Sequence, residues 1–242
     1  MINNAVAGNL TIYPISEGAV SIEFGNTIDD GISEHLNRFN RLLCEKPFEG
    51  MYQTVPAYTT LTIFYYPAVV IKSALPGNNG FDKVCNYLQQ LNREDATTSF
   101  IPEGKLVHIP VYYGSKTGPD LDLVAALHQL TADEVIRLHS SAIYKVYMMG
   151  FIPGFAYLGG LPDLLETPRK TTPVKVPAGA VGIAGKQTGV YPLAVPGGWQ
   201  IIGQTPVELF NSKREQPTLL NSGDRVKFEP ISFNDFKNYS RE

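Results

Sequence analysis

The sequence GFIPGFAYLGGLPDLLETPRKTTPVKVPAGAVGIAGKQTGVYPLAVPGGWQIIG, residues Gly150–Gly203, decides the fold of this chain. Eighteen of its 54 residues are glycine or proline, and it holds half of the 22 glycines and the only tryptophan. Glycine permits positive φ and close backbone approach, whereas proline fixes φ and removes a hydrogen-bond donor. Such a segment cannot be a helix or an uninterrupted central strand. Its apolar residues between the turns predict short strands and shaped loops around a core.

The residues on both sides of this segment continue the same pattern. Lys105–Tyr113 and Tyr144–Met149 alternate as strands, and Trp199–Ile231 indicates further strands joined by turns. Two short helices are expected between them, one opening near Asp120 and one at the capping box Thr131–Glu134. Many short strands with few helices predict a closed or nearly closed β-barrel over residues 105–242.

The first part of the chain has mixed helical and strand periodicity. A capping-box pattern at residues 27–30 and a stripe from Ile28 to Leu43 predict an amphipathic helix, and a second helical stripe begins at Phe81. Strands are expected at Leu10–Ile15, Ala19–Phe24, Met51–Val55 and Tyr58–Tyr65. Residues 1–92 are therefore predicted to form a small α+β sandwich with its helices on one side of a sheet. The polar residues 93–104 are expected to form the linker, which makes the whole chain α+β and mostly β.

Composition excludes several classes of function. The 242 residues carry a net charge of −3 and a pI near 5.8, with no block of Lys or Arg, so no nucleic-acid partner is expected. The chain starts without a basic-then-apolar leader and has no apolar run long enough for a membrane span. With only two cysteines, a cytoplasmic location without membrane association is the simplest expectation.

No self-contained catalytic motif is present. The segment Ala180–Gln187 lacks the first glycine and the final Ser/Thr of a P-loop, and Pro192 forbids the long helix that a P-loop requires. Lys186 is then either a different kind of anion contact, aided by nearby backbone N–H groups, or a solvated turn residue. The four histidines show no metal-site spacing, and no Gly-x-Ser-x-Gly elbow occurs. His139 is expected near a helix end, where an imidazolium would suit the dipole.

Two residues of the glycine- and proline-rich segment are candidates for ligand binding. Arg169 follows Pro168 on a stiff, extended stretch, where a guanidinium suits planar recognition of a carboxylate or phosphate. An ordinary structural ion pair is the alternative. Trp199 follows Gly197-Gly198 and either walls a ligand pocket, anchors a partner or fills the barrel.

Several motifs occur together, in this order and spacing, in one known family. They are Gly150-Phe-Ile-Pro-Gly-Phe-Ala-Tyr-Leu-Gly-Gly-Leu-Pro162, Thr167-Pro-Arg169, Val176-Pro-Ala-Gly179, Val181-Gly-Ile-Ala-Gly185, Gln187-Thr-Gly-Val-Tyr-Pro192 and Pro196-Gly-Gly-Trp199. The chain resembles the family of the B-type component of bacterial 5-oxoprolinase, which also contains the kinase inhibitor KipI and proteins called allophanate hydrolase subunit 1. The match continues through Val20-Ser-Ile-Glu-Phe-Gly25 and covers nearly the whole chain.

This resemblance implies a cyclophilin-like barrel without prolyl isomerase activity, and a subunit that is inactive alone. With a C-type (KipA-like) subunit and an A-type subunit, it would convert 5-oxo-L-proline, ATP and water to L-glutamate, ADP and phosphate. ATP with Mg²⁺ is expected for the complex, not necessarily on this subunit, and no metal site is expected in this chain. The cleft shared with the C-type subunit is expected to involve Phe151, Pro153, Gly154, Phe155, Tyr157, Arg169, Gly185, Lys186, Gln187, Tyr191, Gly197, Gly198 and Trp199.

Two alternatives follow from the same resemblance. A KipI-like inhibitor would dock on a histidine kinase through an exposed apolar patch instead of a catalytic cleft. A carboxyltransferase component of a urea carboxylase or allophanate-type system would need a biotin carrier in its complex. The sequence identifies no nucleophile or general base for any of these functions.

Overall fold

The computed structural model describes residues 10–95, 104–114 and 116–239. The chain divides into two compact units, Met1–Pro102 and Glu103–Glu242, called here the N-terminal unit and the barrel unit. The first three residues of the expected linker, 93–95, instead continue helix α3 (Gly80–Asp95). Arg93 and Glu94 are exposed and follow the last buried positions of the helix, Leu91 and Asn92. Residues 96–103 of that linker lie outside the described residues.

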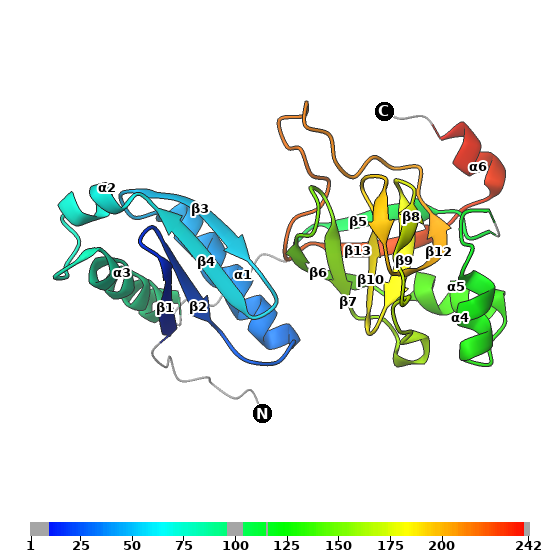
Figure 1. Cartoon of the computed structure of the whole chain (residues 1–242), viewed down its shortest axis with the longest axis horizontal. Coiled ribbons are helices and arrows are strands. Elements are labelled where there is room, and N and C mark those ends of the chain that lie inside the picture. Colours follow the sequence, from blue (N-terminus) through cyan, green and yellow to red (C-terminus); the bar gives the residue numbers. More distant parts are fainter. Residues whose placement is uncertain (1–9, 96–103, 115, 240–242) are drawn as a thin grey trace. The chain divides into compact units, whose positions relative to one another are not determined.

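The N-terminal unit is a four-stranded antiparallel sheet with helices α1 and α3 packed on one face (Figure 1). Side chains alternate across the strands, so Val20, Ile22, Leu61 and Ile63 all face the helices and are fully buried. The predicted α+β sandwich is confirmed. Its elements are β1 (Thr11–Ser16), β2 (Ala19–Glu23), α1 (Asp30–Glu45), β3 (Met51–Pro56), β4 (Thr60–Tyr65), α2 (Pro67–Lys72) and α3, with strand order β1-β2-β4-β3.

The structure differs from the local predictions in this unit at two places. Helix α1 begins at Asp30, not at Ile28, because Asp29 is its N-cap and accepts the Gly31 N–H at 2.8 Å. Ile28 therefore precedes the helix and is exposed. The short helix α2 was not predicted, although Pro67 at its first position is a typical helix start.

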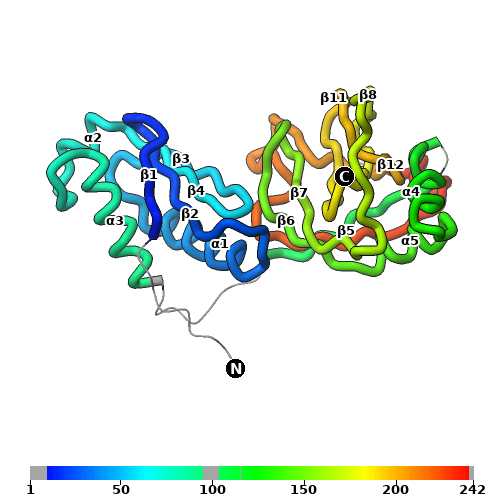
Figure 2. The backbone as a smooth tube through the Cα atoms, turned by 60° about the horizontal axis from the view of Figure 1, so that its bottom comes forward, coloured from blue at the N-terminus to red at the C-terminus, as the bar shows by residue number. Residues whose placement is uncertain are grey.

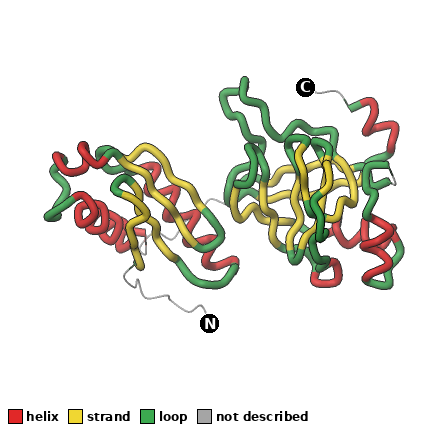
Figure 3. Tube along the Cα trace, in the orientation of Figure 1, coloured by secondary structure: helices red, strands yellow, loops and turns green. Residues whose placement is uncertain are grey.

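The barrel unit contains a seven-stranded sheet that closes on itself (Figures 1 and 3). Its strand order is β12-β9-β10-β7-β6-β13-β5. Just beyond β5, Tyr112 donates its N–H to the Gln204 carbonyl of β12 at 2.9 Å, and Gln204 returns the bond at 3.0 Å. These two bonds join the edge strands, which would otherwise present unpaired backbone groups. The predicted barrel is confirmed.

In the barrel unit, helices α4 and α5 pack together at one end of the barrel (Figure 3). Helix α6 near the C-terminus was not predicted. The elements are β5 (Leu106–Val111), α4 (Leu121–Leu127), α5 (Ala132–Ser141), β6 (Tyr144–Met149), β7 (Ala156–Gly159), a 3-10 turn at Asp163–Leu165, β8 (Val174–Val176), β9 (Ala180–Ala184), β10 (Gln187–Val190), β11 (Val195–Gly197), β12 (Gln200–Gln204), β13 (Arg225–Pro230) and α6 (Phe233–Asn238).

The barrel has a filled interior and a second apolar layer outside it. Val181, Ile183 and Ile202 point inward into the main core. The intervening side chains of the same strands, Ala180, Ala184 and Ile201, point outward. They belong to a separate cluster that also contains Phe155, Val176, Tyr191 and Trp199. The two-stranded sheet of β8 and β11, which lie side by side in Figure 2, contributes Val176 to this outer cluster. Trp199 therefore does not fill the barrel.

His139 is a neutral core residue instead of the imidazolium expected near a helix end. It is fully buried and stacks on Phe228 at 4.7 Å. Its Nδ1 lies 2.8 Å from the Tyr113 hydroxyl and its Nε2 lies 2.8 Å from Thr188 Oγ1. Burial lowers the pKa of His139 to about 3, because the apolar surroundings disfavour its charged form.

Candidate functional site

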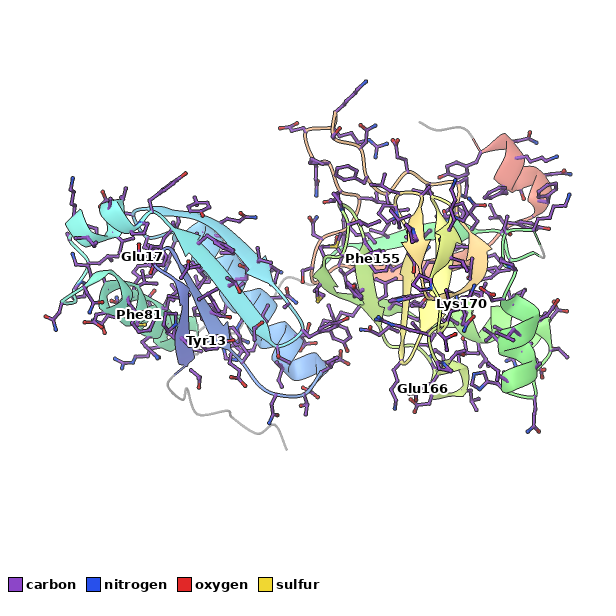
Figure 4. The ribbon with its side chains drawn as sticks, viewed as in Figure 1. Tyr13, Glu17, Phe81, Phe155, Glu166 and Lys170 are labelled. Carbon is purple, nitrogen blue, oxygen red and sulfur yellow. The ribbon has the colours of Figure 1, made fainter. Side chains whose placement is uncertain are left out.

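A pocket of about 250 Å³ lies on the outer face of the barrel, beside the outer aromatic cluster. Phe155 and Lys170, which contribute to its lining, are labelled in Figure 4. We call it the Arg169 pocket. It is lined by Phe151, Phe155, Tyr157, Arg169, Lys170, Thr171, Pro173, Tyr191, Pro196, Gly197, Gly198 and Trp199.

Aromatic side chains form the wall of the Arg169 pocket through edge-to-face contacts. The Phe155 ring lies 5.2 Å from Tyr191 and 5.4 Å from Trp199, centroid to centroid. Two glycines of the underlying strands permit this packing. A Cβ on Gly182 would lie 3.1 Å from the Trp199 Cβ, and one on Gly189 would lie 3.1 Å from the indole ring. The strands therefore carry glycine where the tryptophan lies against the sheet.

Tyr191 supplies the buried hydroxyl of this wall. Burial is the main reason why the pKa of its phenol is raised, and the backbone hydrogen bond from Trp199 and the charge of Arg169 only partly oppose this effect. The phenol thus stays protonated at neutral pH. Its O–H is available as a hydrogen-bond donor, and it does not act as a base.

Arg169 is the cation of the pocket. Its guanidinium carbon lies 5.9 Å from the centroid of the Trp199 ring, within the range of a cation–π contact. The structure gives Arg169 no ion pair among the described residues, so the structural ion pair considered from the sequence does not occur there. The other cation, Lys170, is paired with Asp120 at 2.6 Å. The pocket therefore presents one uncompensated positive charge from its described lining residues.

Phe151 stands at the edge of the pocket in a strained conformation. Its φ is +67°, a left-handed value that costs about 1–2 kcal/mol for a residue with a Cβ. The side chain is 60% exposed although it contacts Phe155 at 5.6 Å. Strain of this kind persists at sites that bind ligands or partners. An exposed aromatic ring held in this way indicates a contact surface.

The structure brings eight of the thirteen residues expected from the sequence into this one pocket and places five outside its lining. Gly154 has φ +82°, and a Cβ there would lie 2.6 Å from the Phe210 side chain. Glycine at this position therefore allows the conformation and packing of the loop, and it does not form the pocket wall. Pro153 precedes it on the surface of the same loop. The remaining three residues, Gly185, Lys186 and Gln187, lie at the turn between β9 and β10.

Lys186 contacts carboxylates of its own chain. Its ammonium lies 3.4 Å from Asp163 and 3.7 Å from Glu166, and these partners raise its pKa, chiefly through the hydrogen bond to Asp163. Glu166 lies well apart from Phe155 in Figure 4. Lys186 lies just before strand β10 at one end and Tyr191 follows it at the other, which explains why the two do not meet.

Residues that sequence reasoning missed come from the neighbours of those it identified. Lys170, Thr171 and Pro173 follow Arg169 along the chain, and Pro196 precedes Gly197. The extended, proline-rich character of residues 168–173 was the signal in the sequence that could have identified them. When one residue of a stiff segment lines a pocket, its neighbours on that segment lie close to the same pocket.

Two further observations concern cofactors and membranes. The segment around Gly185 is an antiparallel β-hairpin, so the geometry agrees with the absence of a P-loop, which needs a strand-to-helix turn. Within the described ranges, no group of three or more His, Cys, Asp or Glu side chains is placed to hold a metal ion. None of the helices that could be described is both long and apolar enough to cross a bilayer.

Comparison with known proteins identifies the relatives of the chain. It is 42% identical over 233 residues to the B-type component of 5-oxoprolinase from Bacillus subtilis strain 168, covering 96% of this chain and 97% of that one. The protein of the same name from Escherichia coli O157:H7 is 40% identical, covering 90% of this chain and 94% of that one.

Solved structures show the same fold as this chain. TTHA0988 superposes with a TM-score of 0.75 at 32% identity, covering 92% of this chain, which spans 40% of that longer protein. Kluyveromyces lactis urea carboxylase shares the fold, with a TM-score of 0.70 at 17% identity, over 94% of this chain and 22% of that one. The family model described as carboxyltransferase domain, subdomain C and D, matches residues 10–220. The chain therefore belongs to the carboxyltransferase subdomain C and D family, among relatives named as the B-type component of 5-oxoprolinase.

Proposed function

We propose that this chain is the B-type component of a cytoplasmic, ATP-dependent 5-oxoprolinase and that the Arg169 pocket is its part of the substrate site. The complex would convert 5-oxo-L-proline, ATP and water to L-glutamate, ADP and phosphate. The observation that carries the proposal is the pocket itself, in which one uncompensated guanidinium lies beside aromatic walls. Identity of 40–42% to 5-oxoprolinase components, over nearly their whole length, supports the choice of reaction.

The pocket suits this substrate chemically. 5-Oxo-L-proline has a carboxylate next to a flat lactam ring. Arg169 can pair with the carboxylate, and Trp199 with Phe155 offers aromatic surface to the ring. Tyr191 can donate a hydrogen bond as a neutral phenol. Positioning of this kind lowers the barrier by removing orientational freedom before the chemical step.

The reacting groups must come from elsewhere. The described residues that line the pocket include no carboxylate, histidine or cysteine, so the pocket offers no evident general base. We assign that role, and the activation of the lactam by ATP and Mg²⁺, to the C-type and A-type subunits. The exposed Phe151 at the pocket edge would contact the C-type subunit and close the site.

The test is an omission assay on the purified subunits. ATP-dependent glutamate formation from 5-oxo-L-proline should need this chain, the C-type subunit and the A-type subunit together. Arg169→Ala should lower kcat/KM about 10²-fold, because the substrate loses its orienting charge. Glu208→Gln removes an exposed ion pair with Arg214 at 3.0 Å, outside the pocket, and is the matched control. Full activity without this chain would refute the proposal.

One observation favours a second function. Phe151 and Val174 are large apolar side chains exposed by 60% and 44% on the barrel unit, as a KipI-like inhibitor of a histidine kinase would require. Affinity capture with the tagged chain separates the two. Recovery of C-type and A-type subunits supports the enzyme, and recovery of a histidine kinase supports the inhibitor. A biotin-carrying protein in the captured complex would instead indicate a carboxyltransferase component.

A further inference from the structure

The segment 168–170 is fixed to the barrel on both sides of Arg169. Before Arg169, the Gln200 side-chain amide donates to the Pro168 carbonyl at 3.0 Å. After it, the Lys170 N–H donates to the Gly198 carbonyl at 2.7 Å. The backbone that carries the guanidinium is therefore held against β12 and the residues just before it, next to Trp199.

A third contact, an ion pair of Lys170, holds the same segment and involves a residue that does not line the pocket. Lys170 Nζ lies 2.6 Å from Asp120 Oδ2, and the two side chains are only 20% and 15% exposed. A charge-assisted bond that is partly shielded from water is stronger and better ordered than a surface ion pair. Asp120 is not among the pocket residues, and no sequence motif pointed to it.

Asp120 is itself fixed to strand β12. The same carboxylate oxygen accepts the Ile201 N–H at 2.6 Å, and the Asp120 N–H donates to the Ile201 carbonyl at 2.9 Å. Asp120 therefore connects three parts of the barrel unit: the start of α4, the backbone of β12 and the segment that carries Arg169. A carboxylate shared between a lysine and a backbone N–H leaves the lysine little freedom to move.

This arrangement also controls the charge of the pocket. Lys170 lines the pocket beside Arg169, and without its partner it would add a second uncompensated cation. Pairing with Asp120 offsets the positive charge of Lys170 with a carboxylate. Arg169 is then the single cation that the described lining offers to an anionic substrate group.

We propose that Asp120 is a positioning residue of the Arg169 pocket: through Lys170 it holds Arg169 beside Trp199 and leaves one guanidinium to orient the substrate carboxylate. The inference about substrate orientation rests on the proposed function. The inference about geometry does not, because it concerns the free chain alone.

Trp199 provides a direct readout of the geometry, since it is the only tryptophan of the chain and lies beside Arg169. In the free chain, Arg169→Ala should change the Trp199 emission and increase its quenching by acrylamide, because the guanidinium no longer covers the ring. Asp120→Asn should reproduce most of that change. Lys170→Met should act in the same way, and Lys170→Arg, which can still pair with Asp120, should stay close to wild type. Glu208→Gln is the control and should not differ from wild type.

The assembled complex tests the functional part. Asp120→Asn should lower kcat/KM for 5-oxo-L-proline about 10-fold, mainly through a higher KM, because a displaced guanidinium orients the substrate poorly. If the Asp120→Asn chain does not fold, Lys170→Met and Lys170→Arg give the same comparison. Wild-type quenching and wild-type kinetics in Asp120→Asn and Lys170→Met would overturn the inference. Altered quenching together with an inactive wild-type complex would instead leave the positioning role intact and refute the proposed reaction.

Discussion

Gly197 tests whether the pocket wall is as closely packed as the structure indicates. A Cβ added at Gly197 would lie 2.5 Å from the Tyr191 hydroxyl oxygen and 2.7 Å from its Cζ. Tyr191 is only 2% exposed and contacts Phe155, so its ring cannot move away without disturbing that contact. Overpacking of this kind costs about 1–3 kcal/mol. In a unit of this size, that loss should lower the Tm by roughly 3–10 °C.

The neighbouring glycine is a matched control. A Cβ at Gly198 would lie no closer than 3.6 Å to the Lys170 carbonyl oxygen, an ordinary contact. Thermal unfolding followed by circular dichroism should therefore show a lower Tm for Gly197→Ala and a nearly unchanged Tm for Gly198→Ala. Trp199 emission should shift in the first variant as Tyr191 moves. Equal melting temperatures for the two variants would show that the Tyr191 wall is loose and would refute the packing argument.

Two further predictions concern stability. Burial lowers the pKa of His139 to about 3 from 6.5, so between these values the unfolded chain binds the proton and the folded chain does not. The contribution of His139 to the free energy of unfolding should therefore be complete above pH 6.5, and the free energy should fall by up to about 1.4 kcal/mol per pH unit below it. Urea unfolding at several pH values should show a weaker pH dependence of this free energy in His139→Gln. The same pH dependence in both proteins would contradict the prediction. Because Phe151 has φ +67°, Phe151→Gly should be about 1 kcal/mol more stable than Phe151→Ala, which keeps a Cβ in the same strained backbone. Both variants should weaken capture of the C-type subunit, and equal stability would show that the strain is absent.

Much of the fold was predictable because local patterns decide it. Alternating apolar residues indicated the strands of both units, and the density of glycine and proline indicated a barrel of short strands. The closure of that barrel was not predictable in its details. It depends on a pair of hydrogen bonds between Tyr112 and Gln204, which lie far apart in the sequence and carry no motif that matches one to the other.

The candidate site was also predictable only in part. Phe155, Tyr191 and Trp199 were expected together, and the structure places them in one cluster. The sequence does not show which turns lie at the same end of the barrel. Lys186 was therefore grouped with these residues, although it lies at the opposite end of β10 from Tyr191.

Asp120 was missed for a related reason. It precedes helix α4 in a segment that sequence reasoning treated only as a helix start. Its contacts with Lys170 and Ile201 arise from the packing of distant segments, and no spacing rule predicts them.

The central claim is that the outer face of the barrel holds one part of a carboxylate-binding site that a partner completes. Titration of 5-oxo-L-proline against Trp199 emission tests it most directly, in the free chain and in a mixture with the C-type subunit. A saturable change that is strong in the mixture, weak in the free chain and lost in Arg169→Ala is the expected result. A change of equal affinity in the Arg169→Ala mixture, or no change in the wild-type mixture, would contradict the account.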